Sequence, residues 1–350
     1  MSKRCTIDTV AQSAGVSKAT VSRVLNGRDV VNAATRLRVL QTMQSLGYAP
    51  KDNRPGRRTS ETGHAPGRTG RIALVVVGTI AESLSHPLMA RMVEDLERAA
   101  ARRGWLLILE RMEAGKEPGL AIRNRTVDGA LLIARGPAIR HALERVAREL
   151  PAVHLLATEH ETANVDHVTA NNTLCGELAF RLLAEHGCKS FAALNIDPSY
   201  HGALVMRLRA FMDCAWASSA SPSMHIVETE GTALTRFYPE ETTAYGNAAD
   251  LVAALTRCPR PLGLFVPTYE QACDVYPLLR KAGLQPGQDV QVCSVGGVDS
   301  ELEGLEPLPL KIDLNVPAMA ARAIAQILHR IESPKDSPVR IEVAPRALPS

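Results

Sequence analysis

The chain has 350 residues, of which 45% are hydrophobic and 22% are charged, and its formal net charge is +3. This composition is ordinary for a globular protein, and the length leaves room for two or three domains. No apolar run of about 18 residues suggests a membrane span, and no apolar core of a signal peptide opens the chain. Seven scattered cysteines without C-x-x-C spacing fit reduced thiols, so we expect a cytoplasmic protein with no metal site and no membrane partner.

The charge is distributed unevenly along the chain. Residues 1–71 contain 13 Lys and Arg against 4 Asp and Glu, whereas the remainder contains 27 against 33. A basic segment on an acidic body predicts that a polyanion binds the first segment only. The alternative is a basic terminus that is merely solvated.

The N-terminal segment has the pattern of three short helices. Thr6 precedes an apolar pattern that continues to Ala14, which predicts a first helix capped by a hydroxyl. Gly15 permits a turn, and Ser17 caps a second helix that ends near Asn26-Gly27. Asn32 or Thr35 begins the third helix. We expect the following side chains to point inward from the second and third helices: Val21, Val24, Leu25, Leu37, Leu40, Met43 and Leu46.

The opposite face of the second helix carries short polar side chains and an arginine. Such a face can enter the major groove, where hydroxyls, backbone amides and arginine meet phosphates and the first residues of the helix reach base edges. Two helices around a glycine turn, closed by a third, form the helix-turn-helix pattern. The alternative is a small three-helix bundle whose polar face is only solvated.

The stretch "TIDTVAQSAGVSKATVSRVLNG…VNAATRLRVLQTMQSLGYAP" resembles the DNA-binding head of the lactose-repressor (LacI) family of bacterial transcription regulators. The resemblance implies that Lys18 and Ala19 read bases and that Arg23 reaches the groove floor. It also implies that Thr20, Ser22 and Asn26 meet the DNA backbone. We further assign Thr6, Ser17 and Asn32 to the DNA-binding surface, and we take residues 1–50 as the DNA-binding domain.

Residues 51–70 read as a linker that departs from the family pattern. The family usually has a short hinge helix here, with an Ala-Arg pair and a leucine wedge, but this chain has Pro55-Gly56. An interior proline costs a helix about 3 kcal/mol and a glycine about 1 kcal/mol more, so we expect no ordinary hinge helix. Arg54, Arg57 and Arg58 could still lie along phosphates or enter a narrow minor groove. A tether without a DNA role is equally open.

Residues 71–350 alternate short apolar runs with amphipathic helical stretches, which predicts parallel sheets with helices on both faces. "RIALVVVG", "WLLILE", "VDGALLIA", "AVHLLAT", "FAALNI", "GLFVP" and "VQVCSVGG" read as strands. Stretches such as "HPLMARMVEDLERAA" and "NNTLCGELAFRLLAEHG" are similar to the family's effector-binding core. That resemblance implies the periplasmic-binding-protein type I fold, with two α/β lobes linked by crossing strands.

The effector site is expected at the carboxyl ends of the strands, between the lobes. Arg207 matches the arginine with which family members commonly hold their effector, and Arg135 and Tyr269 are placed near it. Positions that normally carry aromatic residues, carboxylates or amides hold Leu88-Met89, Leu156, Thr268-Tyr269 and Val298 instead. His86 and Asp299 complete the expected site. An arginine with few carboxylates around it favours an anion, such as a sugar acid or a phosphorylated sugar.

No catalytic or cofactor signature is present. The sequence has no G-x-G-x-x-G, no P-loop, no H-E-x-x-H and no nucleophile elbow, and His154, His160 and His167 lack ligand spacing. We therefore expect a regulator without a cofactor, because a basic helix-turn-helix in a chain without catalytic motifs distinguishes a regulator from an enzyme. We expect a homodimeric repressor that binds a pseudo-palindromic operator in double-stranded DNA and is controlled by a small-molecule effector. The alternatives are a core that has lost small-molecule binding and serves dimerisation or a protein partner, and a solute-binding protein.

Overall fold

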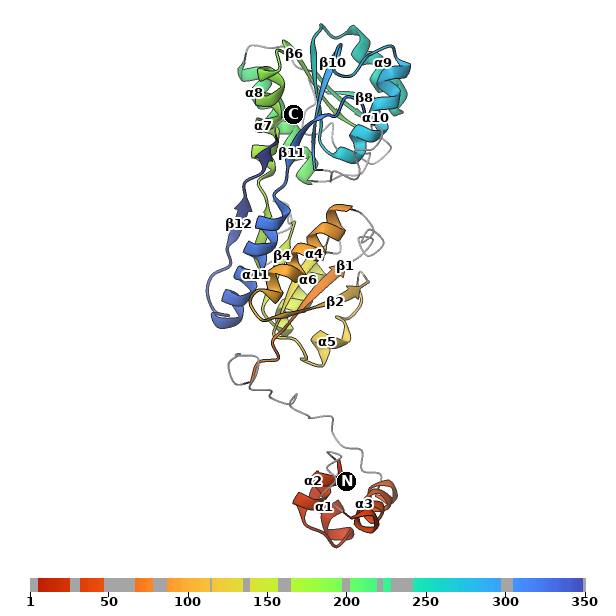
Figure 1. The fold of residues 1–350 in the computed structure, drawn as a ribbon, viewed down its shortest axis with the longest axis vertical. Helices are drawn as coiled ribbons and strands as arrows, with labels where there is room; N and C mark the ends of the chain where they lie inside the picture. Colours follow the sequence, from red (N-terminus) through yellow and green to blue (C-terminus); the bar gives the residue numbers. More distant parts are fainter. Residues whose placement is uncertain are drawn as a thin grey trace. The chain divides into compact units, whose positions relative to one another are not determined.

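The fold comes from a computed structural model of the full chain, which divides into two compact units, Met1–Glu61 and Thr62–Ser350 (Figure 1). The structure describes residues 6–25, 32–46, 67–77, 87–113, 115–134, 139–156, 165–196, 202–218, 223–227, 242–296 and 305–348. Among the helices within these ranges, none is both long and apolar enough to cross a bilayer.

The first unit contains three helices, α1 (Ile7–Ser13), α2 (Lys18–Leu25) and α3 (Ala33–Ser45). Gly15 makes the turn between α1 and α2 with a φ of +63°, a conformation in which a side chain would be strained. The three helices share one small apolar core. Its buried members are Val10, Ala11, Ala14, Val21, Val24, Val39 and Met43.

The prediction that the leucines of α3 point inward was wrong. Leu37, Leu40 and Leu46 are exposed, and α3 contributes Val39 and Met43 to the core. Those two residues are four positions apart, so they lie on one line of the helix, whereas Leu37 and Leu40 lie on neighbouring lines. The sequence could not identify the buried line, because apolar residues occur on each of these lines.

The second unit contains two sheets, of which the first is entirely parallel. Its six strands run in the order β12-β5-β4-β3-β1-β2. The strands are β1 (Arg71–Val77), β2 (Leu106–Met112), β3 (Gly129–Ala134), β4 (Ala152–Leu155), β5 (Asp166–Ala170) and β12 (Arg340–Val343). Helices α4 (Pro87–Ala101) and α11 (Val316–Glu332) cover one face, and α5 (Leu120–Arg123) and α6 (Ile139–Glu149) cover the other.

Strand β1 shows why strands of this parallel sheet have continuous apolar sequences. Alternate residues of β1 enter two different cores, Leu74 on the α4 and α11 side and Val75 on the α6 side. A strand that is buried on both faces has no polar position to spare, which is typical of parallel sheets between helices. We call this sheet and its helices the N-lobe.

The second sheet has seven strands in the order β13-β11-β10-β9-β6-β7-β8, parallel except for β13. The strands are β6 (Ser190–Asn195), β7 (Ser223–Val227), β8 (Thr242–Tyr245), β9 (Leu262–Val266), β10 (Val290–Val295), β11 (Leu310–Asp313) and β13 (Arg346–Ala347). Helices α7 (Asn172–Glu185) and α8 (Gly202–Ala217) pack on one face, and α9 (Ala248–Ala254), continued by the 3₁₀ turn Leu255–Arg257, and α10 (Tyr269–Lys281) on the other. This is the C-lobe.

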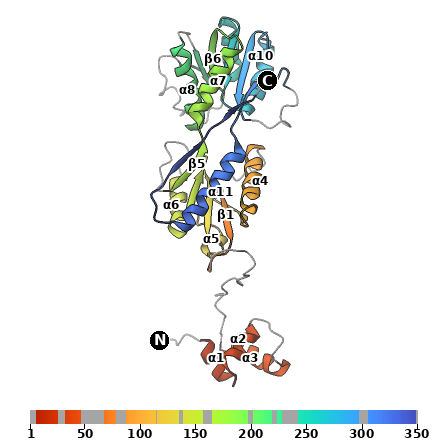
Figure 2. The same cartoon turned by 60° about the vertical axis from the view of Figure 1, so that its left-hand side comes forward.

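Three segments within the described ranges pass between the lobes (Figure 2). They join β5 to α7, β11 to α11, and β12 to β13. One apolar cluster contains residues of both sheets, including Leu74 and Phe265, so the two lobes share a continuous core at the crossing. The expected architecture of a helical head and a two-lobed parallel α/β core is confirmed.

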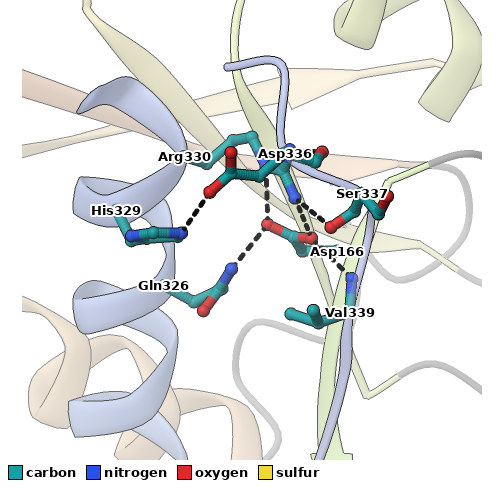
Figure 3. A network of polar contacts seen from close by, with 7 residues as sticks. All are labelled: Asp166, Gln326, His329, Arg330, Asp336, Ser337 and Val339. Atoms are coloured by element: carbon teal, nitrogen blue, oxygen red, sulfur yellow. Dashed lines mark hydrogen bonds and ion pairs between the residues drawn. The ribbon is translucent and has the colours of Figure 1, made fainter. Parts of the chain in front are cut away.

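A buried ionic network fixes one end of the N-lobe (Figure 3). The carboxylate of Asp166, at the start of β5, accepts hydrogen bonds from Nε and Nη2 of Arg330, from Gln326 and from the backbone N–H of Val339. Arg330 also donates to the backbone oxygens of Asp336 and Ser337. The network therefore ties the end of α11, the turn before β12 and the start of β5 together.

Candidate nucleic-acid interface and effector site

Helix α2 begins at a hydroxyl cap. The Oγ of Ser17 accepts a hydrogen bond from the N–H of Thr20 at 3.1 Å, and the two hydroxyl oxygens lie 2.8 Å apart. This contact satisfies a backbone amide of the first turn, as expected of a helix N-cap. Ser17 therefore caps α2, while contact of Ser17 and Thr20 with DNA stays a prediction.

The exposed side of α2 carries the residues predicted to enter the groove. Lys18, Ala19 and Arg23 are exposed, whereas Val21 and Val24 are buried in the head core. The side chain of Ser22 and the whole of Asn26 lie outside the described residues. The described part of α2 thus has the two-sided pattern that a recognition helix needs.

Helices α1 and α3 are capped by residues that the sequence assigned to DNA. Thr6 and Thr9 form a reciprocal capping box at α1, with Thr6 N donating to Thr9 Oγ1 at 2.7 Å. The Oδ1 of Asn32 accepts from the N–H of Thr35 at 2.8 Å, so Asn32 is the residue that begins α3. Both residues have a structural role, and their contact with DNA stays a prediction.

The predicted linker lies mostly outside the described residues, and with it Arg54, Pro55-Gly56, Arg57 and Arg58. Its last residues are anchored to the N-lobe. Thr69 and Gly70 donate their N–H groups to the Asp128 carboxylate at 2.8 to 3.0 Å. Arg68 donates through Nη2 to the carbonyl oxygen of Ile331 at 3.2 Å, so the linker ends against the last turn of α11.

Arg207 is held at the junction of three elements. It lies on α8 and is only 7% exposed. Its Nε donates to Oδ1 of Asn172, the first residue of α7, at 2.9 Å, and its Nη1 donates to the carbonyl oxygen of Pro267, just after β9, at 2.8 Å. A Cβ on Gly176 would lie 2.2 Å from the Arg207 carbonyl oxygen. Gly176 therefore allows α7 and α8 to approach closely enough for these bonds.

Burial lowers the pKa of the Arg207 guanidinium, although Cys175 and Glu270 act in the opposite direction. Both hydrogen-bond acceptors of Arg207 are neutral, and among the described residues none accepts a hydrogen bond from Nη2. A desolvated cation is costly unless a countercharge approaches it.

Tyr269 lies two residues after Pro267 and is the first residue of α10, but its side chain is buried in the C-lobe core. The structure brings Arg207 to the segment that precedes Tyr269 and does not expose the phenol. Met89, at the position of an expected pocket residue, is also buried in a core. The other three predicted effector residues, His86, Arg135 and Asp299, lie outside the described residues.

Two polar pairs at strand ends were not predicted from the sequence. The first is Arg207 with Asn172, which follows β5. In the second, the Oδ1 of Asn195, at the end of β6, accepts a hydrogen bond from Gln271 at 2.8 Å. Gln271 in turn accepts from the N–H of Ile196 at 2.9 Å. The available signal was a buried-strand pattern ending in an amide, at the edge of the sheet where ligands bind.

His154 and His167 face each other on neighbouring strands. They are paired in the register of β4 and β5, and their ring centroids lie 5.5 Å apart. His160 lies outside the described residues. Over the ranges that the structure describes, no group of three or more His, Cys, Asp or Glu could hold a metal ion.

A helix-turn-helix head joined to a two-lobed parallel α/β core defines a DNA-binding transcription regulator. A sequence profile described as "Bacterial regulatory proteins, lacI family" matches residues 6–51, and one described as "Periplasmic binding protein-like domain" matches residues 180–349. The chain thus has a head that matches the LacI family of bacterial regulatory proteins and a core that matches periplasmic-binding-protein-like domains.

Similar proteins extend over nearly the whole chain. The HTH-type transcriptional regulator CelR of Thermobifida fusca is 28% identical, with 97% of this chain and 95% of the relative covered. The HTH-type transcriptional repressor PurR of Edwardsiella ictaluri is 27% identical, with 97% and 94% covered. A solved structure of a CelR–cellobiose complex has the same fold, with a TM-score of 0.60, 23% identity and 99% of each chain covered. These relatives are named as transcription regulators.

Proposed function

We propose that the chain is a homodimeric repressor that binds a pseudo-palindromic operator and is controlled by an anionic, sugar-derived effector. The observation that carries the effector class is the buried Arg207, whose two acceptors are neutral. A carboxylate or phosphate pairs with a guanidinium through two parallel charge-assisted hydrogen bonds, whereas the hydroxyls of a neutral sugar bring no countercharge. The cellobiose in the CelR complex supports a sugar-derived ligand.

The DNA half of the proposal rests on the head. The capped N-terminus of α2 and the exposed Lys18, Ala19 and Arg23 support major-groove entry. The proposed DNA-contacting residues are those assigned from the sequence: Thr6, Ser17, Lys18, Ala19, Thr20, Ser22, Arg23, Asn26, Asn32, Arg54 and Arg57. Repression is supported by the relative named as a repressor.

The proposed dimer contact is the β2 edge of the N-lobe. β2 is the last strand of its sheet, and it exposes Leu106 by 63% and Leu109 by 47%. Apolar residues on an unpaired edge strand are a liability unless another surface covers them. A second copy of the chain, related by a twofold axis, would cover them and would place one head on each operator half-site.

A ligand panel on the full-length protein tests the effector class. Gluconate, galacturonate and glucose 6-phosphate would be compared with cellobiose and ribose by thermal unfolding. An anion at a hundred times its Kd adds about 2.7 kcal/mol to the free energy of unfolding, so the transition temperature should rise by degrees. Arg207→Met should abolish that rise while operator binding is retained. Stabilisation by neutral sugars alone would contradict the anionic class.

One observation favours the alternative core without a small-molecule ligand. Arg207 is already held by Asn172 and Pro267, and Tyr269 is buried, so both side chains have partners inside the protein. In that case the core would serve dimerisation or respond to a protein partner. No stabilisation by any compound of the panel, combined with selective operator binding, would favour this alternative.

A further inference from the structure

A carboxylate lies beside the first residue of the recognition helix. Nζ of Lys18, at the start of α2, lies 2.9 Å from Oδ1 and 3.0 Å from Oδ2 of Asp8 in the first turn of α1. Both side chains are well exposed, 60% for Lys18 and 65% for Asp8. Within residues 6–25 and 32–46 of the head, Asp8 is the only Asp or Glu, against four Lys and Arg.

Folding stability does not explain this carboxylate. An exposed ion pair contributes little, because water and salt screen it and two side chains must be immobilised. An acid in the first turn of a helix favours that helix, but here the carboxylate extends to a lysine on another helix. Beside a phosphate backbone the same carboxylate is repelled, so it weakens binding to DNA of any sequence. A group with that effect is useful where it discriminates between sequences.

The spacing of the pair matches one base-pair edge. In the major groove a G·C pair presents the guanine O6 and N7 acceptors next to the cytosine N4 amino donor. O6 and N4 are hydrogen-bonded to each other, so they are separated by about 2.9 Å, as are the Lys18 and Asp8 atoms. The Lys18 ammonium is therefore complementary to the guanine acceptors, and the Asp8 carboxylate beside it is complementary to the cytosine amino donor.

We propose that Asp8 is a specificity-determining residue and that Lys18 and Asp8 together read one G·C pair in each half-site. Lys18 donates to guanine O6 or N7, and Asp8 accepts from the N4 amino group of the paired cytosine. An A·T pair at that position presents the thymine O4 acceptor to the carboxylate, and the repulsion rejects it. This inference rests on the proposed operator binding.

The test is selection of bound duplexes from a random DNA pool by the full-length protein and its variants. The wild type should enrich a half-site with one invariant G·C pair that Lys18→Ala relaxes. Asp8→Ala should tolerate A·T at that position better than the wild type, and Asp8→Asn should bind both pairs, because its amide can accept from N4 or donate to O4. Replacing that G·C pair by A·T should weaken wild-type binding about ten-fold or more, and Asp8→Ala binding by much less.

Gln41→Lys, on the exposed surface of α3, is the matched control. It raises the head charge by one, as Asp8→Asn does, so it should strengthen binding to all sequences alike and leave the selected site unchanged. Inosine in place of the guanine changes only the minor groove and should leave wild-type affinity unchanged.

The outcomes separate this inference from the function beneath it. If the wild type selects a site and both Asp8 variants select the same one, Asp8 does not read a base and the inference is wrong. A lower melting temperature of Asp8→Ala with an unchanged site would show a helix-stabilising role and would also overturn it. If the wild type enriches no sequence, operator binding itself fails and the inference fails with it.

Discussion

Arg330 and Asp166 form a buried ion pair that joins the end of α11 to the start of β5. Arg330 Nε lies 2.8 Å from Asp166 Oδ2, and the Asp166 side chain is fully buried. Burial by itself would raise the pKa of the Asp166 carboxyl, but hydrogen bonds from Arg330, Gln326 and Val339 outweigh it and lower the pKa below 3.8. The pair therefore keeps both charges at neutral pH although water is excluded.

Asp166→Asn should destabilise the N-lobe strongly. The change leaves the Arg330 guanidinium without its countercharge, and breaking a buried pair in this way costs about 3–5 kcal/mol. Urea unfolding followed by tryptophan fluorescence measures the loss, because Trp105 lies in the core cluster shared by the lobes and Trp216 packs against it. Glu144→Gln is the control, since its partner Arg140 is exposed and the loss should stay within about 0.5 kcal/mol. Equal losses in the two variants would mean that the buried Asp166 network contributes no more to stability than the exposed ion pair.

The same carboxylate predicts a dependence of stability on pH. A group whose pKa is lowered by folding contributes stability that is complete above its unfolded pKa, about 3.9 for Asp. That contribution is lost as the pH falls through the folded pKa, which lies below 3.8. The urea midpoint of the wild type should therefore fall over this acid range. The double variant Asp166→Leu, Arg330→Met should show a flatter profile, and parallel profiles would assign the acid sensitivity to other carboxylates.

Some elements could be predicted from the sequence and others could not, for physical reasons. Helix α4 was predicted correctly because Met92 and Leu96 repeat at the helical period and are both buried. Strand β5 was missed because it begins with Asp166 and His167, and the partner that makes Asp166 tolerable, Arg330, is 164 residues away. The Arg207 site was expected from the family resemblance, but its contact with Asn172 could not be, because α7 and α8 meet through the packing at Gly176.

Operator binding should weaken steeply with salt. Each phosphate neutralised by a cation contributes a slope of about −0.9 in log K against log salt. If Arg57 lies along a phosphate, Arg57→Gln should make the slope shallower by about one for each subunit. Electrophoretic mobility shifts between 50 and 200 mM salt would measure it. An unchanged slope would favour the reading of residues 51–70 as a tether without a DNA role.

A charge on the β2 edge should separate the proposed dimer. Leu109→Lys places an ammonium where we expect the partner's apolar edge, and a buried unpaired charge costs several kcal/mol. Sedimentation velocity should show monomers, with the helical signal unchanged because Leu109 is exposed. Val339→Lys is the matched control, since Val339 is exposed beside β12 at the opposite edge of the same sheet. Monomers for both variants, or dimers for both, would place the interface elsewhere.

Asn172→Asp should give Arg207 an internal countercharge. The new carboxylate has the shape of the amide and lies about 2.9 Å from Nε, so a charge-assisted hydrogen bond replaces a neutral acceptor. The gain of about 1–2 kcal/mol from a hydrogen bond to a charged group is offset in part by the loss of the Asn172 Nδ2 hydrogen bond to the Ala170 carbonyl oxygen, so the free energy of unfolding should rise by about 1 kcal/mol or less. Because the guanidinium is then neutralised, stabilisation by an anionic effector should disappear in the thermal assay.

Asn195→Asp is the control for that change, because it places the same carboxylate at another buried strand end. Its hydrogen-bond partner there is the Gln271 amide and not a cation, so this variant should be destabilised while it keeps its response to anions. The opposite signs of the two variants isolate the charge of Arg207 from the general effect of burying a carboxylate. An anion response that survives in Asn172→Asp would mean that the anion binds away from Arg207.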